Sequence, residues 1–521
     1  MKRGWIFSNF TVAIAILLTG GFATPGHAAS VVPMVELDHS HIEAGKEAVV
    51  HVLVDFKVAK IAPDKEKSRP PLNLALVLDR SGSMEDRGKL EYAKKAANTL
   101  VDLLKPTDRL AVVEYDDQIT VLWPSAPVSS PDMIKRRIGT LTPRGSTNLT
   151  GGMMKGVDEV LSAKEKAKEA LNRVILMSDG LANQGVTHPA EIARLVREAR
   201  GKGVRITTMG LGRDYDEDLM TAIAENSGGH YYYIESPQQM ARVYQQEMSV
   251  LMTMVTKDVK FDLQASPAVT DVKVYGFPAE TRDGVTKVSM EDFYAEETRT
   301  LLFQFKVAAR NAGEWPVAKL VMNYEDLTSG TTEKLTSEIK VTATGDPIVV
   351  AQNENKEVAA EAALVHAEEE QEKYVRLYEQ GDTAGALAGM KQLADAVKQQ
   401  NAQFNDARLA KKAEALEMES GDLNRAAAAP AVAANYLKQR KQQFYLAKQG
   451  KRGKYMMQSG DKGFDVERLQ EALAKEGFYK GAIDGEYDDD VVVAVKAFQK
   501  DRKLTDDGIA GPATLRELKI Y

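Results

Sequence analysis

The chain has 521 residues, more than one hydrophobic core accommodates, so we expect three or four domains. Hydrophobic residues make up 44% and charged residues 27%, a balance typical of globular proteins, and the net charge is -7. We expect no nucleic-acid partner, because nucleic-acid binding requires a clustered basic surface. The sequence contains no cysteine, which excludes disulfides, thiolate metal sites, cysteine nucleophiles and the cysteine of a lipoprotein anchor.

The start of the chain has the pattern of an export signal. Lys2 and Arg3 precede an apolar stretch centred on residues 12–18, and small residues up to Ala28 fit signal-peptidase cleavage, which makes residues 1–28 a signal peptide. An uncleaved anchor is the alternative. No later stretch of the sequence approaches the roughly 20 apolar residues of a membrane span. We therefore expect export to the periplasm, cell wall or cell surface, with no transmembrane span after signal removal.

Two β-rich regions flank an α/β region. Residues 31–70 contain the alternating stretch 48–54, which predicts a strand with a buried face. Residues 254–345 alternate in the same way, with no helix-length pattern between the strands, which indicates an antiparallel β-sandwich. We expect the strands of the first region to complete this sandwich, so that residues 71–253 form a domain inserted between its two parts.

The inserted region, residues 71–253, alternates strands with helices. Its first strand, Leu72 to Leu78, is almost continuously apolar, which is typical of a central parallel strand covered on both faces. Further strands are predicted at 109–114, 173–177 and 204–209, and helices at 89–104, 150–161, 189–200, 217–225 and 238–252. This alternation predicts a doubly wound parallel sheet with right-handed crossovers.

The rest of the chain divides into three parts. Residues 350–426 have helical spacing and predict two or three helices, with breaks near Gly381 and Gly421. Residues 427–458 are interpreted as a linker with a short helix, whose basic residues suit contact with an acidic envelope polymer. Residues 459–521 are expected to form a separate compact domain of three helices.

Polar side chains cluster at the ends of the strands in the predicted sheet. Asp79, Ser81 and Ser83 follow the first strand, and Thr147 and Asp179 lie in loops that end on the same side. Ligands bind outside the carboxyl ends of strands in open α/β sheets. The first loop lacks the glycine patterns that bind phosphate, and its carboxylate and hydroxyls are the hard oxygen ligands that Mg²⁺ prefers. The sequence therefore predicts a Mg²⁺ site, with Mn²⁺ or Ca²⁺ as alternative ions.

Three motifs in this order carry a resemblance to a known family. They are Asp-x-Ser-x-Ser, a threonine within Gly-Ser-Thr-Asn, and Ser-Asp-Gly after an apolar strand. Together they resemble the von Willebrand factor A fold and its metal-ion-dependent adhesion site over residues 71–253. The resemblance implies that Thr147 coordinates the metal directly, that Asp179 acts through water, and that an acidic side chain of a protein ligand completes the coordination. The flanking strands look like those of bacterial secreted proteins related to inter-α-trypsin inhibitor heavy chains.

The last region carries a second set of motifs. An amphipathic helix ends at Gly477, and an Asp-Gly turn precedes each of the two helices that follow. These features resemble the small three-helix peptidoglycan-binding domain, which implies peptidoglycan as a second partner. Candidate glycan-binding residues are Asp484, Gly485, Phe498, Gln499, Asp507 and Gly508. Asp488 and Val491 stand where the family usually has Gly and Thr, and a folded domain without its ligand is the alternative.

These observations predict a non-enzymatic, metal-dependent protein-binding scaffold that is tethered to the cell wall. We assign no catalytic residue, because the chain lacks H-E-x-x-H and Ser178 does not lie in a G-x-S-x-G elbow. His39 and His41 share a strand face without an evident third metal ligand. Two alternatives stay open: a peptidoglycan hydrolase or an accessory subunit of one, and an assembly or secretion scaffold that acts through the helical segment.

Overall fold

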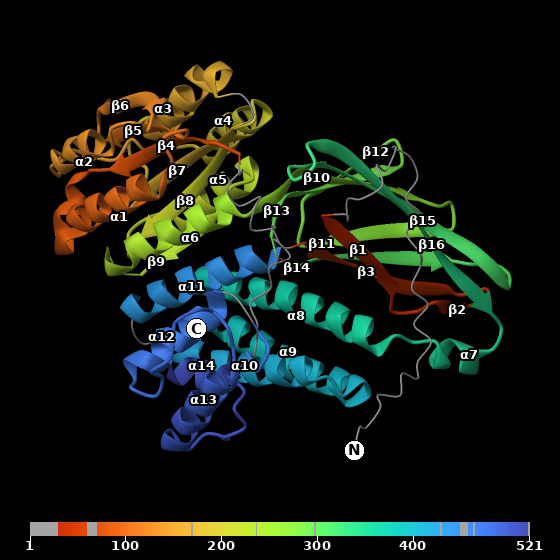
Figure 1. The fold of residues 1–521 in the computed structure, drawn as a ribbon. Coiled ribbons are helices and arrows are strands. Elements are labelled where there is room, and N and C mark those ends of the chain that lie inside the picture. The colour runs from red at the N-terminus through yellow and green to blue at the C-terminus, as the bar shows by residue number, and fades with distance from the viewer. Residues whose placement is uncertain are drawn as a thin grey trace, which may run out of the picture.

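The structure is a computed structural model. It describes residues 30–59, 70–167, 170–235, 237–295, 298–427, 430–448, 457–461 and 464–518. The predicted signal peptide lies outside the described residues. Within them, the chain forms an α/β domain, a two-sheet β-sandwich, a set of long helices and a small C-terminal helical module (Figure 1). No helix in these ranges combines the length and the apolar character that crossing a membrane requires.

The β-sandwich is built from strands on both sides of the α/β domain in the sequence. One sheet has the order β1-β3-β14-β11 and the other the order β12-β13-β10-β15-β16-β2. The strands are β1 (Val31–Leu37), β2 (His41–Glu43), β3 (Glu47–Val58), β10 (Met254–Ala265), β11 (Val269–Tyr275), β12 (Ala279–Arg282), β13 (Val285–Tyr294), β14 (Thr298–Ala308), β15 (Gly313–Asp326) and β16 (Thr331–Thr344). β3 pairs with β14 and β2 pairs with β16, which confirms the predicted insertion of the α/β domain.

The core of the sandwich forms because alternate side chains of each strand point between the two sheets. Val52, Val54 and Phe56 of β3 are buried there. The ring centroid of Phe56 lies 5.4 Å from that of Phe261 and 5.3 Å from that of Phe293, both in the opposite sheet. A shift of β3 by one residue would turn these side chains toward solvent, so the aromatic contacts specify the pairing register.

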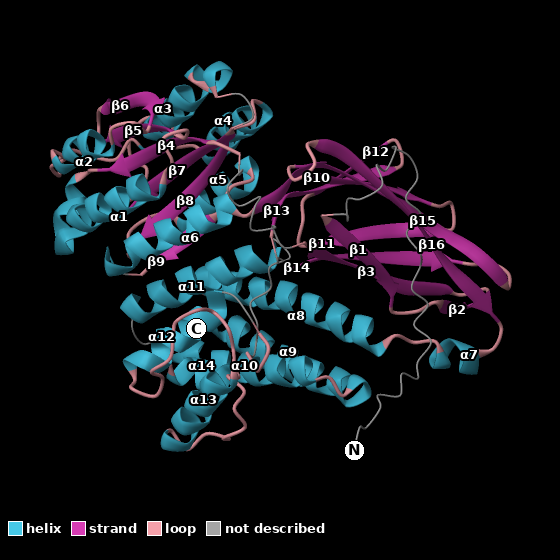
Figure 2. Cartoon of the chain, in the orientation of Figure 1, coloured by secondary structure: helices cyan, strands magenta, loops and turns pink. Residues whose placement is uncertain are grey.

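The α/β domain contains a six-stranded sheet in the order β6-β5-β4-β7-β8-β9. Its strands are β4 (Leu72–Asp79), β5 (Arg109–Tyr115), β6 (Ile119–Pro127), β7 (Leu171–Ser178), β8 (Arg205–Leu211) and β9 (Tyr231–Ile234). One face is covered by α1 (Lys89–Leu103), α2 (Pro131–Gly139) and α6 (Met240–Met252), the other by α3 (Leu149–Ser162), α4 (Pro189–Gly201) and α5 (Glu217–Ser227) (Figure 2). This is the predicted doubly wound arrangement, and it buries every residue of β4.

The sequence patterns did not predict β6 and α2. β6 is an edge strand that runs antiparallel to β5, and none of its side chains is fully buried. The alternation of apolar and polar residues that marks a half-buried strand is therefore weak. β6 also contains Pro124, which an edge strand tolerates because the missing N–H is not needed for pairing.

The helical segment consists of α7 (Pro347–Gln352), α8 (Lys356–Glu379), α9 (Thr383–Phe404), α10 (Ala407–Ala427) and α11 (Pro430–Lys448). The predicted break near Gly381 separates α8 from α9. The predicted break near Gly421 is wrong, because this residue lies inside α10. The chain turns instead at Asn405, whose φ of 55° is left-handed, a conformation that asparagine tolerates better than most residues.

Within the segment that we interpreted as a linker with a short helix, residues 430–448 form the 19-residue helix α11, which packs against the α/β domain. Lys438 is buried, and its ammonium group donates to the backbone oxygen of Tyr215 (2.8 Å) and to the carboxylate of Glu217 (2.5 Å). The Tyr445 hydroxyl donates to the backbone oxygen of Gly229 (2.8 Å). Lys438 and Tyr445 are therefore part of a domain interface, whose partners lie too far away in the sequence for local patterns to reveal.

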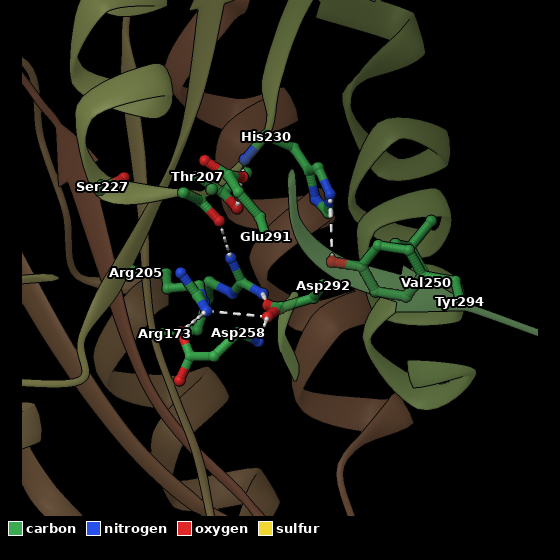
Figure 3. A network of polar contacts seen from close by, with 12 residues as sticks. Arg173, Arg205, Thr207, Ser227, His230, Val250, Asp258, Glu291, Asp292 and Tyr294 are labelled. Carbon is green, nitrogen blue, oxygen red and sulfur yellow. Dashed lines mark hydrogen bonds and ion pairs between the residues drawn. The ribbon is translucent and has the colours of Figure 1, made fainter. Parts of the chain in front are cut away.

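A network of polar groups joins the α/β domain to the sandwich at the amino ends of β8 and β9 (Figure 3). Arg205 of β8 donates to the carboxylate of Asp292 in β13 (2.8 Å). Nδ1 of His230 lies 2.8 Å from Oε2 of Glu247 in α6, and its Nε2 lies 3.2 Å from the hydroxyl of Tyr294 in β13. Because the strands are parallel, this junction leaves their carboxyl ends on the opposite side of the domain.

The C-terminal module has three helices, α12 (Phe464–Lys475), α13 (Asp489–Asp501) and α14 (Pro512–Glu517). Buried apolar side chains from all three form its core, including Leu469, Val495 and Leu515. The module rests on α10, where a Cβ added to Gly511 would lie 2.9 Å from Nζ of Lys411.

Candidate metal centre

The candidate centre begins where β4 ends. Asp79 is the last residue of β4, and its side chain is fully buried. Its Oδ1 accepts a hydrogen bond from the backbone N–H of Ser81 (2.8 Å). Its Oδ2 accepts from the hydroxyls of Ser178 (2.8 Å) and Tyr115 (3.2 Å), which end the two neighbouring strands. Oδ1 is thus held by the loop that follows β4, and Oδ2 by groups at the ends of the neighbouring strands β5 and β7.

Ionisation of the Asp79 carboxyl group is energetically unfavourable in this position. Burial, and secondly the nearby carboxylate of Asp179, raise the pKa of Asp79 to about 6. A cation bound beside the two carboxylates would stabilise their charged forms and lower this pKa again. The electrostatics of the centre therefore favour a bound cation.

The loop after β4 carries two serine hydroxyls. Oγ of Ser81 and Oγ of Ser83 are 3.1 Å apart, and the Ser83 hydroxyl donates to Oδ1 of Asp179 (2.7 Å). The backbone N–H of Gly82 donates to the backbone oxygen of Gly145 (3.1 Å). This bond ties the serine loop to the loop that carries the threonine.

Thr147 lies in the loop that precedes α3. Its N–H donates to the side-chain oxygen of Asn183 (2.9 Å), and its backbone oxygen accepts from the N–H groups of Asn183 and Gln184, both at 3.2 Å. A Cβ added to Gly180 would lie 3.5 Å from Oγ1 of Thr147 and 3.6 Å from Oγ of Ser83. The two hydroxyls therefore border the same space, which the glycine leaves open.

The structure brings the five predicted residues, Asp79, Ser81, Ser83, Thr147 and Asp179, together at the carboxyl edge of the sheet. Three hydroxyls and two carboxylates suit a hard divalent cation such as Mg²⁺. The described part of the chain holds no group of three or more His, Asp and Glu side chains that is arranged to bind a metal. The donor set fits the ion, and the assignment of the individual ligands stays a prediction.

The candidate glycan-binding turns of the C-terminal module are each closed by a buried glutamine. The side-chain oxygen of Gln470 accepts from the N–H groups of Asp484 (3.1 Å) and of the glycine that follows it (2.9 Å), and its nitrogen donates to Oδ1 of Asp484 (2.8 Å). Gln499 holds the second turn in the same way, through the N–H of Gly508 (2.9 Å) and Oδ1 of Asp507 (3.0 Å). The repeated Asp-Gly motif therefore has a structural role.

Two of the candidate glycan contacts do not face solvent. Phe498 and Gln499 are 0% and 2% exposed, so the geometry gives them a role in the fold, and glycan contact by the candidate residues stays a prediction. The departure from the family pattern also has a structural explanation. Asp488 caps α13, because its Oδ1 accepts from the backbone N–H of Val491 (3.0 Å).

Comparison with known proteins identifies two of these units. Residues 73–246 match the sequence model of the von Willebrand factor type A domain. The α/β domain is a von Willebrand factor type A (VWA) domain. Residues 462–518 match the sequence model of a putative peptidoglycan binding domain, so a VWA domain and a module of that family stand in one chain.

Relatives of the VWA region occur in bacteria and in animals. The chain is 31% identical over 266 residues to the uncharacterized protein YfbK of Escherichia coli, a match that covers 49% of this chain and 46% of that protein. It is 28% identical over 300 residues to the uncharacterized protein sll0103 of Synechocystis, covering 55% and 69% of the two. It is 28% identical over 196 residues to human inter-alpha-trypsin inhibitor heavy chain H4, covering 36% and 21%. The chain thus spans about half the length of the first relative and about a fifth of the third.

Two solved structures share the fold. A von Willebrand factor type A protein from Catenulispora acidiphila superposes with a TM-score of 0.58 at 18% identity, covering 75% of this chain and 91% of that chain. The ArnB paralog VWA2 from Sulfolobus acidocaldarius gives a TM-score of 0.51 at 17% identity, covering 81% and 99%. These superpositions cover 75% and 81% of this chain, whereas the VWA match covers only residues 73–246. The shared arrangement therefore extends beyond the VWA domain.

The sequence motifs missed two groups beside the centre of the VWA domain. The first is Lys89, whose ammonium group lies 2.6 Å from Oδ2 of Asp179. The second is Asp116, whose Oδ2 accepts from Nε of Arg144 (2.7 Å) and lies 2.9 Å from Nε of Arg80. Burial opposes ionisation of Asp116, but the bond from Arg144 and the two arginine charges hold its pKa below the usual value. Asp116 and its two arginine partners connect the loop that presents the serines with the loop that presents the threonine.

One of these groups left a signal in the sequence. Lys89 is the first residue of a helix, where the helix dipole disfavours a cation. A basic residue in that position, six residues after the last serine of the loop, contradicts the local preference and points to a role outside the helix. Asp116 left no comparable signal, because both its arginine partners lie in other loops.

Proposed function

We propose that this chain is an exported scaffold whose VWA domain binds a protein partner through a divalent metal, and whose C-terminal module holds the chain at peptidoglycan. An interaction domain of the VWA family together with a domain of the peptidoglycan-binding family supports a scaffold or adhesion function. Export rests on the signal pattern of residues 1–28. The metal and the acidic ligand rest on the centre itself.

The observation that carries this proposal is the convergence of three hydroxyls with two buried carboxylates at one edge of the sheet. Asp79 and Asp179 are fully buried and accept hydrogen bonds from neighbouring groups, whereas Ser83 is exposed. Ser81, Ser83 and Thr147 would hold the ion, and the buried carboxylates would orient these hydroxyls. Neutral hydroxyl ligands do not compensate the positive charge of Mg²⁺. When bound, the ion would therefore offer an electrophilic position to an anionic oxygen.

The same geometry supports binding rather than catalysis. A general base needs an oxygen or nitrogen that is free to accept a proton from the reacting group. Asp79 accepts hydrogen bonds at both oxygens, and Asp179 accepts from Ser83 and from Lys89. Both carboxylates are also fully buried, so neither is exposed to a water that it could activate.

Removal of one hydroxyl tests the metal assignment. Thr147→Ala deletes a donor without changing any charge, and we expect it to weaken Mg²⁺ affinity by about 10- to 100-fold. Thr142→Ala, an exposed threonine just before the same loop, is the matched control and should bind as the unmodified chain does. Titration calorimetry with Mg²⁺ measures both. Equal affinity of the two variants would contradict the assignment.

The partner is tested by affinity purification from envelope extracts with the full chain as bait. We expect protein partners to be retained with Mg²⁺ and released by EDTA, and Thr147→Ala to retain none. Retention on purified sacculi should not respond to EDTA, because it depends on the C-terminal module. Identical protein retention with and without EDTA would contradict metal-dependent binding, and clearing of a peptidoglycan zymogram would favour the hydrolase alternative.

A further inference from the structure

Lys89 is a buried cation inside the candidate metal centre. Its side chain is 8% exposed, and its ammonium group lies 2.6 Å from Oδ2 of Asp179, which is itself fully buried. The other oxygen of this carboxylate accepts from the hydroxyl of Ser83 at 2.7 Å. The ammonium group is therefore linked to a predicted metal donor through a single carboxylate.

The backbone is shaped to place this lysine. Arg87 and Gly88, which precede it, have left-handed φ values of 51° and 68°. This conformation is unfavourable for arginine, and such strain persists only where the surroundings require it. A cation in the first turn also opposes the dipole of α1. Because neither feature benefits the helix, the position of Lys89 is explained by the centre that it enters.

We propose that Lys89 sets the charge of the centre so that tight metal binding requires an anionic ligand. This inference rests on the proposed metal site and specifies how the site couples metal to partner. Asp79 and Asp179 contribute one negative charge each and Lys89 one positive charge, which leaves one net negative charge. A divalent cation then makes the filled centre positive, and one carboxylate from the partner makes it neutral.

Without Lys89, the two carboxylates alone would neutralise the divalent cation, and the attraction for an added carboxylate would fall. The lysine thus weakens the affinity for the metal alone and strengthens the affinity of the metal-filled centre for an acidic side chain. By linkage the effect is reciprocal, so an anion must also tighten metal binding.

The test measures Mn²⁺ affinity of the full chain by calorimetry, in chloride and in acetate buffers of equal ionic strength. Acetate is the carboxylate probe. In the unmodified chain, we expect acetate to tighten Mn²⁺ binding. In Lys89→Met, we expect Mn²⁺ affinity in chloride to rise by about tenfold or more, because a positive charge next to the ion is removed, and the effect of acetate to disappear.

Three further variants make the result specific. Lys89→Arg keeps the charge and should retain the effect of acetate. Lys95→Met removes an exposed lysine from the same helix and should behave as the unmodified chain does. Lys89→Gln keeps an N–H donor for Asp179 without the charge, and we expect the same result from it as from Lys89→Met. It replaces the methionine variant in the test if that variant fails to fold.

The outcomes separate this inference from the proposed function. An unmodified chain that does not bind Mn²⁺ overturns the metal site, and the role of Lys89 with it. An unmodified chain that binds Mn²⁺ without a response to acetate overturns the role of Lys89 alone. Unchanged or weaker Mn²⁺ binding by Lys89→Met and Lys89→Gln, with the response to acetate retained, also overturns it and leaves the lysine as a structural partner of Asp179.

Discussion

Gln499 fixes the second Asp-Gly turn of the C-terminal module through one buried amide. Its nitrogen donates to Oδ1 of Asp507 (3.0 Å) and to the backbone oxygen of Ile509 (2.8 Å), and its oxygen accepts from the N–H of Gly508 (2.9 Å). A buried polar group that loses its partner costs about 1–3 kcal/mol. A single side chain thus determines whether this turn keeps its shape.

We expect Gln499→Met to destabilise the module by about 2–4 kcal/mol, because methionine has a similar size but leaves these groups without partners. Hydrogen exchange of peptides from α12 to α14 in the full chain measures the loss. Lys500→Met, at the exposed neighbouring position, is the control and should exchange as the unmodified chain does. Normal exchange in Gln499→Met together with lost sacculus binding would instead show a direct contact with glycan.

That the five candidate residues lie close together could be predicted from the topology together with the three sequence motifs. In a parallel sheet, the loops after the strands must share one edge, so Asp79 and Asp179 meet whatever the packing details are. Lys89 and Tyr115 could not be placed in this way. Their roles depend on side-chain directions, which bring one to Asp179 and the other to Asp79.

At the scale of elements, α11 connects the helical segment to the VWA domain. Its residue Lys438 is 3% exposed and lies 3.9 Å from the ring centroid of Tyr215, in addition to its bonds with the backbone of Tyr215 and with Glu217. Tyr445 contributes a second contact, an edge-to-face arrangement with Tyr231 at 5.8 Å. The helix is therefore anchored at two points of the domain.

Lys438→Met should loosen this anchor by about 2–3 kcal/mol, because a buried backbone oxygen loses its donor and Glu217 loses the nearer of its two lysine partners. Hydrogen exchange of the amides in α11 should become faster, while exchange in the β-sandwich stays the same. Lys391→Met removes an exposed lysine of α9 and serves as the control. Unchanged exchange in α11 would mean that its apolar contacts alone hold the helix.

Elements with strong periodicity were predicted correctly, and those whose form depends on distant contacts were not. The buried strand β4 and the amphipathic helices on both faces of the VWA sheet have clear patterns. α11 lacks one, because its side chains meet different surroundings on several sides: Phe444 packs in the helical segment and Tyr445 in the VWA domain. A helix that fills a space between two domains has no single apolar face for a local pattern to reveal.

At the scale of the whole molecule, the VWA domain contacts the sandwich at one end of its sheet and carries the candidate metal centre at the other. The chain enters the domain before β4 and leaves it after α6, and the polar junction with the sandwich lies at the amino ends of the strands (Figure 3). The candidate metal centre lies at their carboxyl ends. This arrangement leaves the edge that carries the centre directed away from the sandwich, as a partner-binding surface requires.

Glu247 of α6 lies beside that junction, on the VWA side, and contacts His230, which reaches Tyr294 of the sandwich. Its carboxylate is fully buried and accepts from Thr207 (2.7 Å), Tyr232 (3.0 Å) and His230 (2.8 Å). Burial opposes ionisation, but the charges of His230 and Arg173 and these hydrogen bonds lower the pKa of Glu247 to about 2. Because the pKa is lower in the folded chain than in the unfolded chain, the ionised group stabilises the fold above pH 4.5, and this contribution is lost as the pH falls toward 2.

We expect Glu247→Gln to be less stable than the unmodified chain by at most about 3 kcal/mol at pH 7, and the difference to shrink toward zero near the lowered pKa, because the variant has no charge to lose there. Hydrogen exchange of β8, β9 and α6, measured at several pH values in the full chain, follows the difference. Glu191→Gln, at an exposed carboxylate of α4, controls for the change in net charge. A difference that stays constant from neutral to acidic pH would show that the glutamate acts through hydrogen bonds alone, and that its charge does not stabilise the VWA side of the junction.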